Sequence, residues 1–348
     1  MKQLTIAVPS YNSAAFISKG LDSYIYEDGT MDPRLEVIIV NDGSTDDTLK
    51  VARSYEERFP DGFTVIDKEN GGHGSGINAG IDAARGRYYK VIDSDDWILT
   101  ENLKDILDSL EASGADIVTT GFHTVNLASN VTLAYGAGDE KRELKMSEFV
   151  KIKDDILSAQ MFHGLMYNTE FYRAAGIRMS EGVFFEDQEY AILPFMHAQT
   201  ILLLPYFMYE YQTGNQSQSV NFENQGKKSD HLLIVLKNLI HYYNKIFENA
   251  DGTAETEARR QYCSWRISNV VTSYYAAVLV KSSEREEGRE KAAIFRGYLE
   301  DEAPDIAAAT EDKYSKLTRM SRIPGVSAVY GKLFNSGLYK TFKKHWIK

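Results

Sequence analysis

Short apolar runs alternate with segments of helical periodicity through the first 120 residues. Runs of four to six apolar or β-branched residues predict strands, and apolar residues recurring every three or four positions predict helices. The predicted strands are 4–8, 35–40, 63–67, 88–92 and 117–120, and the predicted helices are 14–24, 45–59, 76–84 and 100–113. Repeated strand–helix units with short loops predict an α/β fold, with a mostly parallel sheet flanked by helices.

The pattern changes after about residue 122. Segments 124–132 and 135–145 indicate a β-hairpin or an irregular insert, and 147–158 and 169–176 indicate helices. Residues 201–211 predict a strand that Pro205 kinks or confines to an edge. Three long helices follow, at 230–249, 255–281 and 284–302. We therefore expect an α/β domain over 1–222, a helical region over 223–312 and a separate tail over 313–348.

The composition is that of a soluble globular protein, with 43% hydrophobic and 26% charged residues. The one cysteine, Cys263, excludes an internal disulfide framework and a cysteine-based zinc site, and it fits a reducing cytoplasm. The first apolar run is interrupted at Pro9, too soon for a signal peptide, and no stretch reaches the length of a transmembrane helix. We therefore expect a cytoplasmic protein.

Charge is distributed unevenly along the chain. Nine of the 39 basic residues and none of the 50 acidic residues lie in 313–348, so residues 1–312 carry a net charge of −20. A body this acidic makes nucleic acid an unlikely partner. The tail combines Lys and Arg with Phe, Tyr and Trp, which predicts either peripheral contact with the inner face of an anionic membrane or docking on the acidic body.

The clearest chemical signal follows the strand 88–92, which ends in Asp93, Asp95 and Asp96. Clustered carboxylates at the end of a buried strand cost free energy unless a cation or hydrogen bonds compensate them. Hard oxygen ligands suit Mg²⁺ or Mn²⁺, with phosphate oxygens completing the coordination. The structural alternative is a solvated strand end whose Asp96 caps the helix that begins near Thr100.

Two earlier strands also end in polar loops. Pro9, Tyr11 and Asn12 follow the first strand, where the aromatic ring and the amide would hold a base and a ribose, although these residues also favour a simple turn. Asp42 follows the second strand, where its carboxylate would accept a hydrogen bond from a pyrimidine N–H. The Ser44–Thr45 pair after it is typical of a helix cap.

A glycine-rich loop follows the third strand, at residues 70–80. Glycines before a helix let the backbone approach a phosphate, and the N-terminus of a helix favours negative charge. The glycine spacing matches neither the P-loop nor the Gly-x-Gly-x-x-Gly pattern. Because ligands bind beyond the carboxyl ends of strands in open parallel sheets, the four loops together predict one ligand site.

The four motifs together resemble glycosyltransferase family 2, the inverting nucleotide-sugar transferases of the GT-A fold. The resemblance rests on Val-Pro-Ser-Tyr-Asn, Val-Asn-Asp-Gly-Ser-Thr-Asp-Asp-Thr, Asn-Gly-Gly…Asn-Ala-Gly and Asp-Ser-Asp-Asp-Trp, and it continues more loosely to about residue 220. It implies a nucleotide-binding half over 1–121 and an acceptor half over 122–222. The implied partners are a nucleotide-sugar donor, usually a UDP-sugar, and a saccharide or lipid-linked saccharide acceptor.

The resemblance also assigns roles to residues. It implies that Asp95 and Asp93 hold the divalent metal, Mn²⁺ or Mg²⁺, with Asp93 nearer the ribose and Asp96 either sharing that role or capping a helix. The implied nucleotide-sugar site comprises Pro9, Tyr11, Asn12, Asp42, Gly71, Gly72, His73, Asn78, Asp93 and Ser94.

An acidic pair, Glu186–Asp187, matches the base motif of the family. Asp187 would deprotonate the acceptor hydroxyl, which attacks the anomeric carbon opposite the leaving diphosphate. Neighbouring aromatic residues, Phe184, Phe185 and Tyr190, would partly desolvate this base and raise its pKa. Taken alone, the pair also fits the N-terminus of a helix on an acidic surface.

One position departs from the family pattern, because Ile77 stands where the family often carries Arg. His73, Lys90 or Arg87 would have to supply the missing positive charge, although a lone histidine such as His73 or His163 is more often structural. Two other functions stay open. A nucleotidyltransferase of related fold would need a glycine-rich basic loop after the first strand, and a non-catalytic binding protein would not need Asp95 and Asp187.

Overall fold

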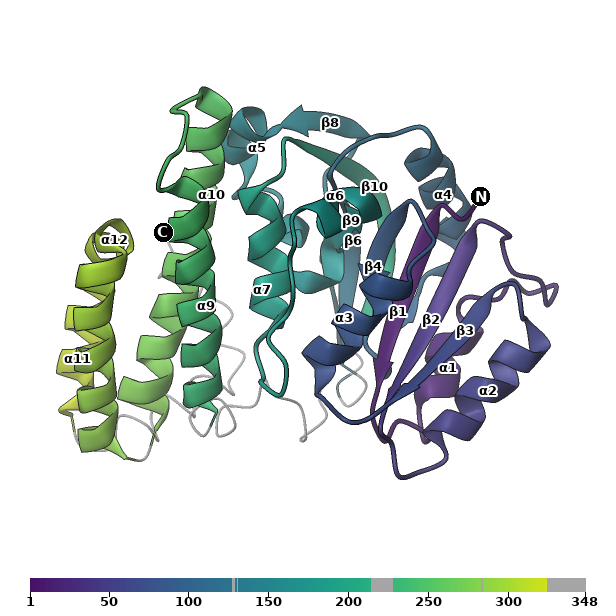
Figure 1. Ribbon diagram of the computed structural model, residues 1–348, viewed down its shortest axis with the longest axis horizontal. Helices are drawn as coiled ribbons and strands as arrows, with labels where there is room; N and C mark the ends of the chain where they lie inside the picture. Colours follow the sequence, from purple (N-terminus) through teal and green to yellow (C-terminus); the bar gives the residue numbers. More distant parts are fainter. Residues whose placement is uncertain (127–128, 130, 214–227, 283, 324–348) are drawn as a thin grey trace. The chain divides into compact units, whose positions relative to one another are not determined.

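The computed structural model describes residues 1–126, 129, 131–213, 228–282 and 284–323 (Figure 1). The chain forms two compact units, one of residues 1–214 and 251–259 and the other of residues 215–250 and 260–348. The domain limits expected at residues 222 and 312 stay predictions. Residue 312 itself lies within helix α12, Pro304–Ser321.

The first half of the large sheet is parallel, as the repeated strand–helix units predict. Its strands are β1 (Leu4–Ser10), β2 (Leu35–Asp42), β3 (Phe63–Lys68) and β4 (Tyr88–Val91), in the order β3-β2-β1-β4. The helices between them are α1 (Ile17–Asp22), α2 (Thr48–Arg58) and α3 (His73–Ala83), and α3 packs on β1 and β2 (Figure 1). Strands β1, β2 and β4 are buried along their whole length, as expected for a sheet covered on both faces.

The second half of the sheet mixes parallel and antiparallel strand pairs. The order continues β4-β9-β6-β10-β5, and β9 (Leu165–Asn168) is antiparallel to both β4 and β6. The other strands are β6 (Ile117–Asn126), β10 (Thr200–Thr213), β5 (Trp97–Ile98), β7 (Val131–Tyr135) and β8 (Arg142–Lys145). Sequence analysis missed β9, because four residues carry too little periodicity to identify a strand.

Helix α4 (Leu103–Glu111) shows how periodicity determines burial in this unit. Leu103, Ile106, Leu107 and Leu110 are spaced three or four positions apart or adjacent, and all four are buried. The remaining elements of the unit are η1 (Thr100–Asn102), α5 (Met146–Ile152), η2 (Leu157–Gln160), η3 (Phe162–Gly164), α6 (Thr169–Ala174), α7 (Asp187–Ile192) and η4 (Leu193–Met196). The helix expected over 147–158 is therefore too long, since it ends at Ile152.

The other unit is helical, as predicted. It contains α9 (Ser229–Phe247), most of α10 (Ala254–Ala276), the π-helix η5 (Ala277–Lys281), α11 (Arg285–Glu302) and α12 (Pro304–Ser321). The sequence did not suggest α12, which begins at Pro304 immediately after α11 ends. Tyr274, Tyr275 and Phe295 form an aromatic cluster in the core of this unit.

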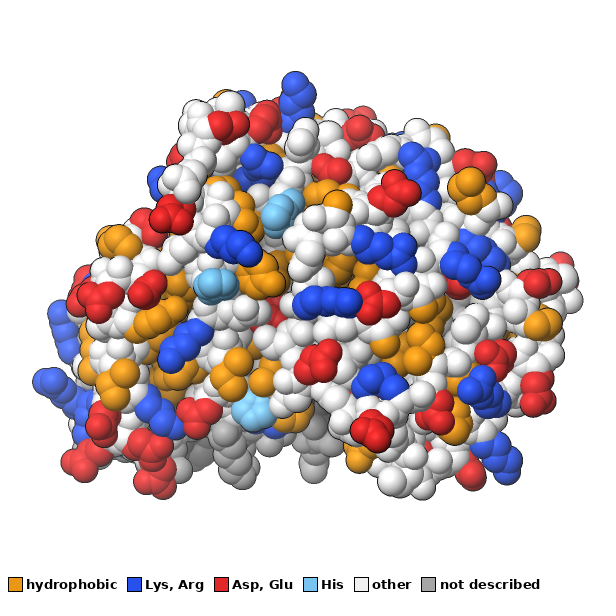
Figure 2. All heavy atoms as spheres, in the orientation of Figure 1, with side chains coloured by type: hydrophobic (Ala, Val, Ile, Leu, Met, Phe, Trp, Pro, Cys, Tyr) orange, Lys and Arg blue, Asp and Glu red, His pale blue; other side chains and the backbone are white. Residues whose placement is uncertain are grey.

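Within the described part of the chain, none of the helices has the length and hydrophobicity that crossing a bilayer requires. On the visible face, acidic and basic side chains are interspersed and no single sign of charge dominates (Figure 2). The expected tail falls partly on α12, and its residues 324–348 lie outside the described residues.

Candidate active site

The loops after strands β1, β2 and β4 are joined by direct hydrogen bonds. The backbone N–H of Asn12 donates to Ser44 Oγ at 3.0 Å, and the N–H of Thr45 donates to Asn12 Oδ1 at 2.8 Å. Ser13 and Ser94 share a hydroxyl–hydroxyl bond of 2.7 Å. The expected cap at Ser44 or Thr45 is wrong, because α2 begins only at Thr48, where Asp46 accepts the backbone N–H. Ser44 and Thr45 instead hold Asn12.

Asp42 ends β2 and is buried beneath the glycine-rich loop. Its Oδ1 accepts from Lys68 Nζ at 2.7 Å and from the N–H of Gly71 at 3.0 Å, and its Oδ2 accepts from the N–H of Gly72 at 2.8 Å. Ser75 Oγ also donates to Oδ1, at 3.2 Å. The carboxylate therefore fixes the shape of this loop, and its expected contact with a nucleobase stays a prediction.

The glycines of residues 71–76 let this loop pack against the loop that precedes the base motif. Gly72 has φ 85°, a conformation that favours glycine, and a Cβ on Gly74 would lie 2.2 Å from the carbonyl oxygen of Ser180. The N–H of Gly182 donates to the carbonyl of Gly71 at 2.8 Å. These glycines thus bring two backbone segments together, whereas the sequence suggested that they make room for a phosphate.

Asn78 joins the same two segments from helix α3. Its amide nitrogen donates to the carbonyl of Met179 and to Glu181 Oε1, each at 3.0 Å, and its Oδ1 accepts from the N–H of Met179 at 2.9 Å. Both ends of the amide are therefore engaged with residues 179–181. A direct contact between Asn78 and a nucleotide sugar stays a prediction.

His73, the first residue of α3, lies between two of the predicted functional acids. Its Nδ1 is 2.7 Å from Glu186 Oε1 and its Nε2 is 3.0 Å from Asp93 Oδ1. Burial by itself lowers the pKa of the imidazole, but the hydrogen bonds to Asp93 and Glu186 outweigh it and raise the pKa well above its ordinary value of 6.5. A positive charge therefore lies between these two carboxylates.

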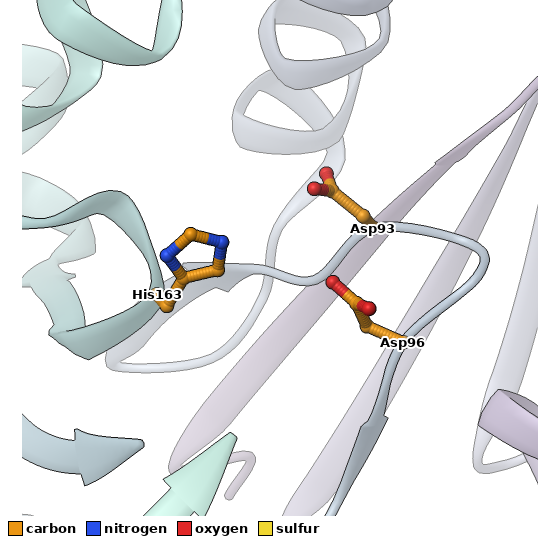
Figure 3. A group of neighbouring side chains, drawn as sticks. All are labelled: Asp93, Asp96 and His163. Carbon is orange, nitrogen blue, oxygen red and sulfur yellow. The ribbon is translucent and has the colours of Figure 1, made fainter. Parts of the chain in front are cut away.

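The acids after β4 form a compact group that suits a divalent cation. Ligand atoms of Asp93, Asp96 and His163 all lie within 4.8 Å of one another (Figure 3). Burial, and then the charge of Asp93, raise the pKa of Asp95 to about 6. A carboxyl group whose pKa is raised by a neighbouring carboxylate is one that a bound cation would compensate. Two carboxylates and an imidazole are ligands that Mn²⁺ accepts, and Mg²⁺ prefers the oxygens.

Asp96 does not cap a helix, which corrects that expectation. Its Oδ2 accepts from the hydroxyl of Tyr209 at 2.6 Å, and its Oδ1 accepts from the N–H of Gln212 at 2.7 Å. Helix α4 has no side-chain cap, and its N-cap residue is Asn102. Asp96 therefore anchors the loop after β4 to strand β10, which the sequence spacing could not show.

The base motif lies at the N-terminus of α7. Phe185 has φ 74°, a left-handed conformation that is rare for an aromatic residue, and Asp187 begins the helix immediately after Glu186. Burial, followed by the charge of Glu186, raises the pKa of Asp187 to about 7. This rise in the pKa of Asp187 is in the expected direction. The side chain of Phe184 is 43% exposed, however, and shields Asp187 little from solvent. A carboxylate with this pKa is suited to accept a proton near neutral pH.

Two candidates for the missing positive charge are excluded by their positions. Lys90 is fully buried in β4, and its Nζ donates to the carbonyls of His163 at 2.7 Å and Leu165 at 3.1 Å. Arg87 precedes β4, at the opposite end of the strand from Asp93, and it donates to the carbonyl of Glu111. Of the three candidates, His73 alone lies beside the acids.

Sequence reasoning undervalued His163 and missed Glu189. Lys90 holds the backbone of the turn η3, and the ring of His163 stacks on Tyr211 with centroids 4.1 Å apart, which directs it toward Asp93 and Asp96 (Figure 3). Glu189 accepts from the backbone N–H and the hydroxyl of Ser180, at 2.6 and 2.7 Å. No motif marked either residue, because each acts through a contact between segments distant in sequence.

A parallel half-sheet whose strand ends bear a carboxylate cluster, continued by a mixed half that carries an acid of raised pKa, is the arrangement expected of the GT-A fold. Residues 5–173 match the family model for glycosyl transferase family 2. The chain is therefore a glycosyltransferase, and its residues 5–173, just under half of its length, resemble family 2.

Individual relatives agree with this assignment. The chain is 27% identical to the glycosyltransferase EpsJ of Bacillus subtilis over 244 residues, which cover 69% of this chain and 70% of EpsJ. It is 25% identical over 230 residues to TarS of Staphylococcus aureus, a poly(ribitol-phosphate) β-N-acetylglucosaminyltransferase. That match covers 64% of this chain but spans only 37% of TarS.

Solved structures show the same fold at lower identity. Residues 1–349 of S. aureus TarS in complex with UDP-GlcNAc superpose with a TM-score of 0.66 and 18% identity, covering 95% of this chain and 92% of that one. The mannosyltransferase PcManGT of Pyrobaculum calidifontis, in complex with GDP-Man and Mn²⁺, gives a TM-score of 0.50 and 17% identity, covering 96% and 88%.

Proposed function

We propose that this protein transfers a sugar from a UDP-sugar to a hydroxyl group of a saccharide or lipid-linked saccharide, with inversion and with the help of Mn²⁺ or Mg²⁺. The observation that carries the proposal is Asp187, a half-buried acid of raised pKa, whose neighbour Glu186 is linked through His73 to the acid cluster after β4. Such an arrangement supports a role for Asp187 as a proton acceptor near a site that would bind a diphosphate.

The donor would bind over the ends of β1, β2 and β4. Tyr11 is 53% exposed at the end of β1, where its ring is free to stack on a base, and Asn12 is held in place by Ser44 and Thr45. The proposal of UDP follows the family resemblance and the UDP-GlcNAc complex of TarS. PcManGT, which was solved with GDP-Man, makes GDP the alternative.

The residues after β4 fit a divalent cation. Asp93 and Asp95 would hold it according to the family pattern, whereas the geometric group of ligand atoms among the described residues comprises Asp93, Asp96 and His163 and does not include Asp95. When bound, the cation would neutralise charge on the departing diphosphate. Asp93, which keeps a lowered pKa because the hydrogen bond from His73 outweighs its burial, would enter this site ionised.

Asp187 would take the proton of the acceptor hydroxyl as that oxygen attacks the anomeric carbon. Among the residues that the structure describes, Gln188 is the side chain that donates to Asp187, from Nε2–H to Oδ2 at 3.0 Å, so carboxylate lone pairs remain for a substrate. Glu186 is engaged with His73 and would position the motif without taking the proton itself. Attack opposite the leaving group would invert the anomeric configuration.

The biological setting would be synthesis of a cell-surface polysaccharide or a glycolipid, by analogy with TarS. The basic tail would then hold the enzyme at the inner face of the membrane, near a lipid-linked acceptor. Truncation after Ile323 tests this step, because it leaves helix α12 complete. Co-sedimentation with liposomes containing anionic lipid should fall after truncation, and equal partitioning of both forms would contradict membrane contact.

The alternatives fit the structure less well. A nucleotidyltransferase would need a glycine-rich basic loop after β1, where this chain has Pro9, Tyr11 and Asn12. A non-catalytic nucleotide-sugar-binding protein would have no use for an acid such as Asp187 with a pKa near 7.

A thermal-shift screen tests the proposed function directly. Wild-type protein would be heated with UDP, GDP, ADP or dTDP and with UDP-sugars, each with Mn²⁺ or with EDTA. At a ligand concentration of 100 times Kd, binding stabilises the folded protein by about 2.7 kcal/mol. We expect the largest rise in melting temperature with UDP and Mn²⁺. If no nucleotide changes it, the donor assignment fails, and a shift that EDTA leaves unchanged contradicts the metal role of Asp93 and Asp95.

A further inference from the structure

His73 makes two hydrogen bonds that the transfer chemistry above does not by itself require. Nδ1 lies 2.7 Å from Glu186 Oε1 and Nε2 lies 3.0 Å from Asp93 Oδ1. Each ring nitrogen of His73 therefore has a carboxylate partner, one in each motif. The imidazole joins the metal motif to the base motif through these two hydrogen bonds, and hydrogen bonds to ionisable groups of this kind are among the stronger ones in proteins.

The two partners of His73 come from segments far apart in the sequence. Asp93 is 20 positions away and Glu186 is 113 positions away. The segments around Gly71 and Gly182 are in backbone contact, and a side chain on Gly74 would collide with Ser180. This close packing brings the first residue of α3 within reach of both acids.

The base motif needs a contact from outside its own segment, because its local structure has little stability of its own. Helix α7 has only six residues, and the positive φ of Phe185 stores strain directly before Glu186. Glu186 precedes the helix, and it is 6% exposed. A bond from His73 to its carboxylate fixes the direction in which the helix starts, and hence the direction of Asp187.

We propose that His73 is a positioning residue that keeps the side chain of Asp187 correctly placed relative to the donor site. It does so only while its hydrogen bonds to Glu186 and Asp93 are both present. This inference rests on the proposed function, and it differs from the expectation that His73 binds the nucleotide sugar. Displacing a catalytic group by about 1 Å can cost on the order of 100-fold in rate. Loss of either bond should therefore reduce turnover without reducing the affinity for the nucleotide to a similar extent.

Two substitutions separate the two bonds. His73→Asn places an amide N–H near the position of Nδ1 and retains the contact with Glu186, whereas His73→Gln places one near Nε2 and retains the contact with Asp93. His73→Ala removes both. His123→Gln is a matched control, because it removes another histidine–carboxylate pair, that of His123 and Glu210.

The measurements are the rate of UDP release from UDP-GlcNAc and the Kd for UDP with Mn²⁺, determined by calorimetry. We expect the Ala, Asn and Gln variants of His73 each to lose about 10- to 100-fold in kcat, with Kd within about threefold of wild type. His123→Gln should keep the wild-type kcat. Adding Glu186→Gln to His73→Ala should reduce kcat little further, because both changes break the same link.

Three results would overturn the inference. They are wild-type kcat in either single-bond variant, a rise in Kd as large as the fall in kcat, or fully multiplicative losses in the double variant. The proposed function fails in a different way, namely if the wild-type protein neither binds a nucleotide diphosphate nor releases one from any sugar donor. Melting temperatures measured alongside the kinetics identify any variant that fails to fold. If His73→Ala does not fold, the kcat and Kd values of His73→Asn and His73→Gln test the inference.

Discussion

The hydroxyl of Tyr209 lies 2.6 Å from Oδ2 of Asp96, although the two residues are 113 positions apart. The same hydroxyl accepts a hydrogen bond from the backbone N–H of Asp93 at 3.1 Å. One side chain of β10 therefore holds both the backbone and a carboxylate of the loop that bears the proposed metal ligands. The loop owes its shape to a strand from the other half of the sheet.

Tyr209→Phe should therefore destabilise the protein. The substitution leaves the N–H of Asp93 without its acceptor and removes one donor from the buried carboxylate of Asp96. Leaving buried polar groups unpaired costs about 1–3 kcal/mol. Urea denaturation should show a loss of that size in the free energy of unfolding. Tyr11→Phe, which changes an exposed hydroxyl, is the control, and equal stability of both variants would contradict the anchoring role.

Asp95→Asn should act on metal binding and leave stability unchanged. Asp95 is partly buried, and its pKa is raised to about 6 by burial and by Asp93, so removing its charge relieves repulsion. We expect the melting temperature to stay equal or rise slightly, while the effect of Mn²⁺ on UDP affinity falls at least about tenfold. Calorimetry with Mn²⁺ or EDTA measures this effect. A variant that responds to Mn²⁺ as the wild type does would show that Asp95 is not a ligand.

Asp187→Asn should nearly abolish transfer. A general base contributes about 10²- to 10⁴-fold, and an amide cannot take a proton. Because the pKa of Asp187 is raised to about 7, the wild-type rate should rise with pH through a midpoint near 7, as the carboxyl ionises. The residual rate of the variant should not show this rise with pH. Initial rates between pH 5 and 9 test both points, and turnover of the variant at the wild-type rate would disprove the base assignment.

The same substitution should stabilise the protein above neutral pH. The pKa of Asp187 rises from an ordinary 3.8 to about 7 on folding, so the folded protein holds its proton more tightly than the unfolded chain does. The associated stability is present below pH 3.8 and is lost as the pH rises through 7. Asp187→Asn should therefore raise the free energy of unfolding by roughly 1–3 kcal/mol at pH 8.

Chemical denaturation at pH 4 and pH 8 measures this difference. The gain in the free energy of unfolding should be smaller at pH 4, because the carboxyl group of Asp187 is then protonated in the folded protein and no charge has to be buried. A gain of equal size at both values would mean that burial of charge is not its cause. Glu186→Gln is a useful comparison, because it removes a negative charge that is already paired with His73.

The sequence alone determined the first half of the fold and the location of the site. Parallel strands with continuous apolar runs must be buried, and their carboxyl ends must meet at one edge. The sequence alone therefore predicts that the polar loops after residues 8, 40 and 92 lie at one edge of the sheet. The acid pair Glu186–Asp187 was found through family resemblance, since the residues alone fit a helix N-terminus equally well.

Tertiary structure decided the partner of each polar group. The sequence left a helix cap and a share in metal binding open for Asp96, and the side chain bonds to Tyr209 and Gln212 instead of capping a helix. The short strand β9 carried too little pattern to be predicted, and His163, expected to be structural, lies among the ligand candidates. Local sequence reports periodicity and turn preference, which act over a few residues. The hydrogen bonds of a buried carboxylate depend on which distant strand or loop the whole fold brings within about 3 Å.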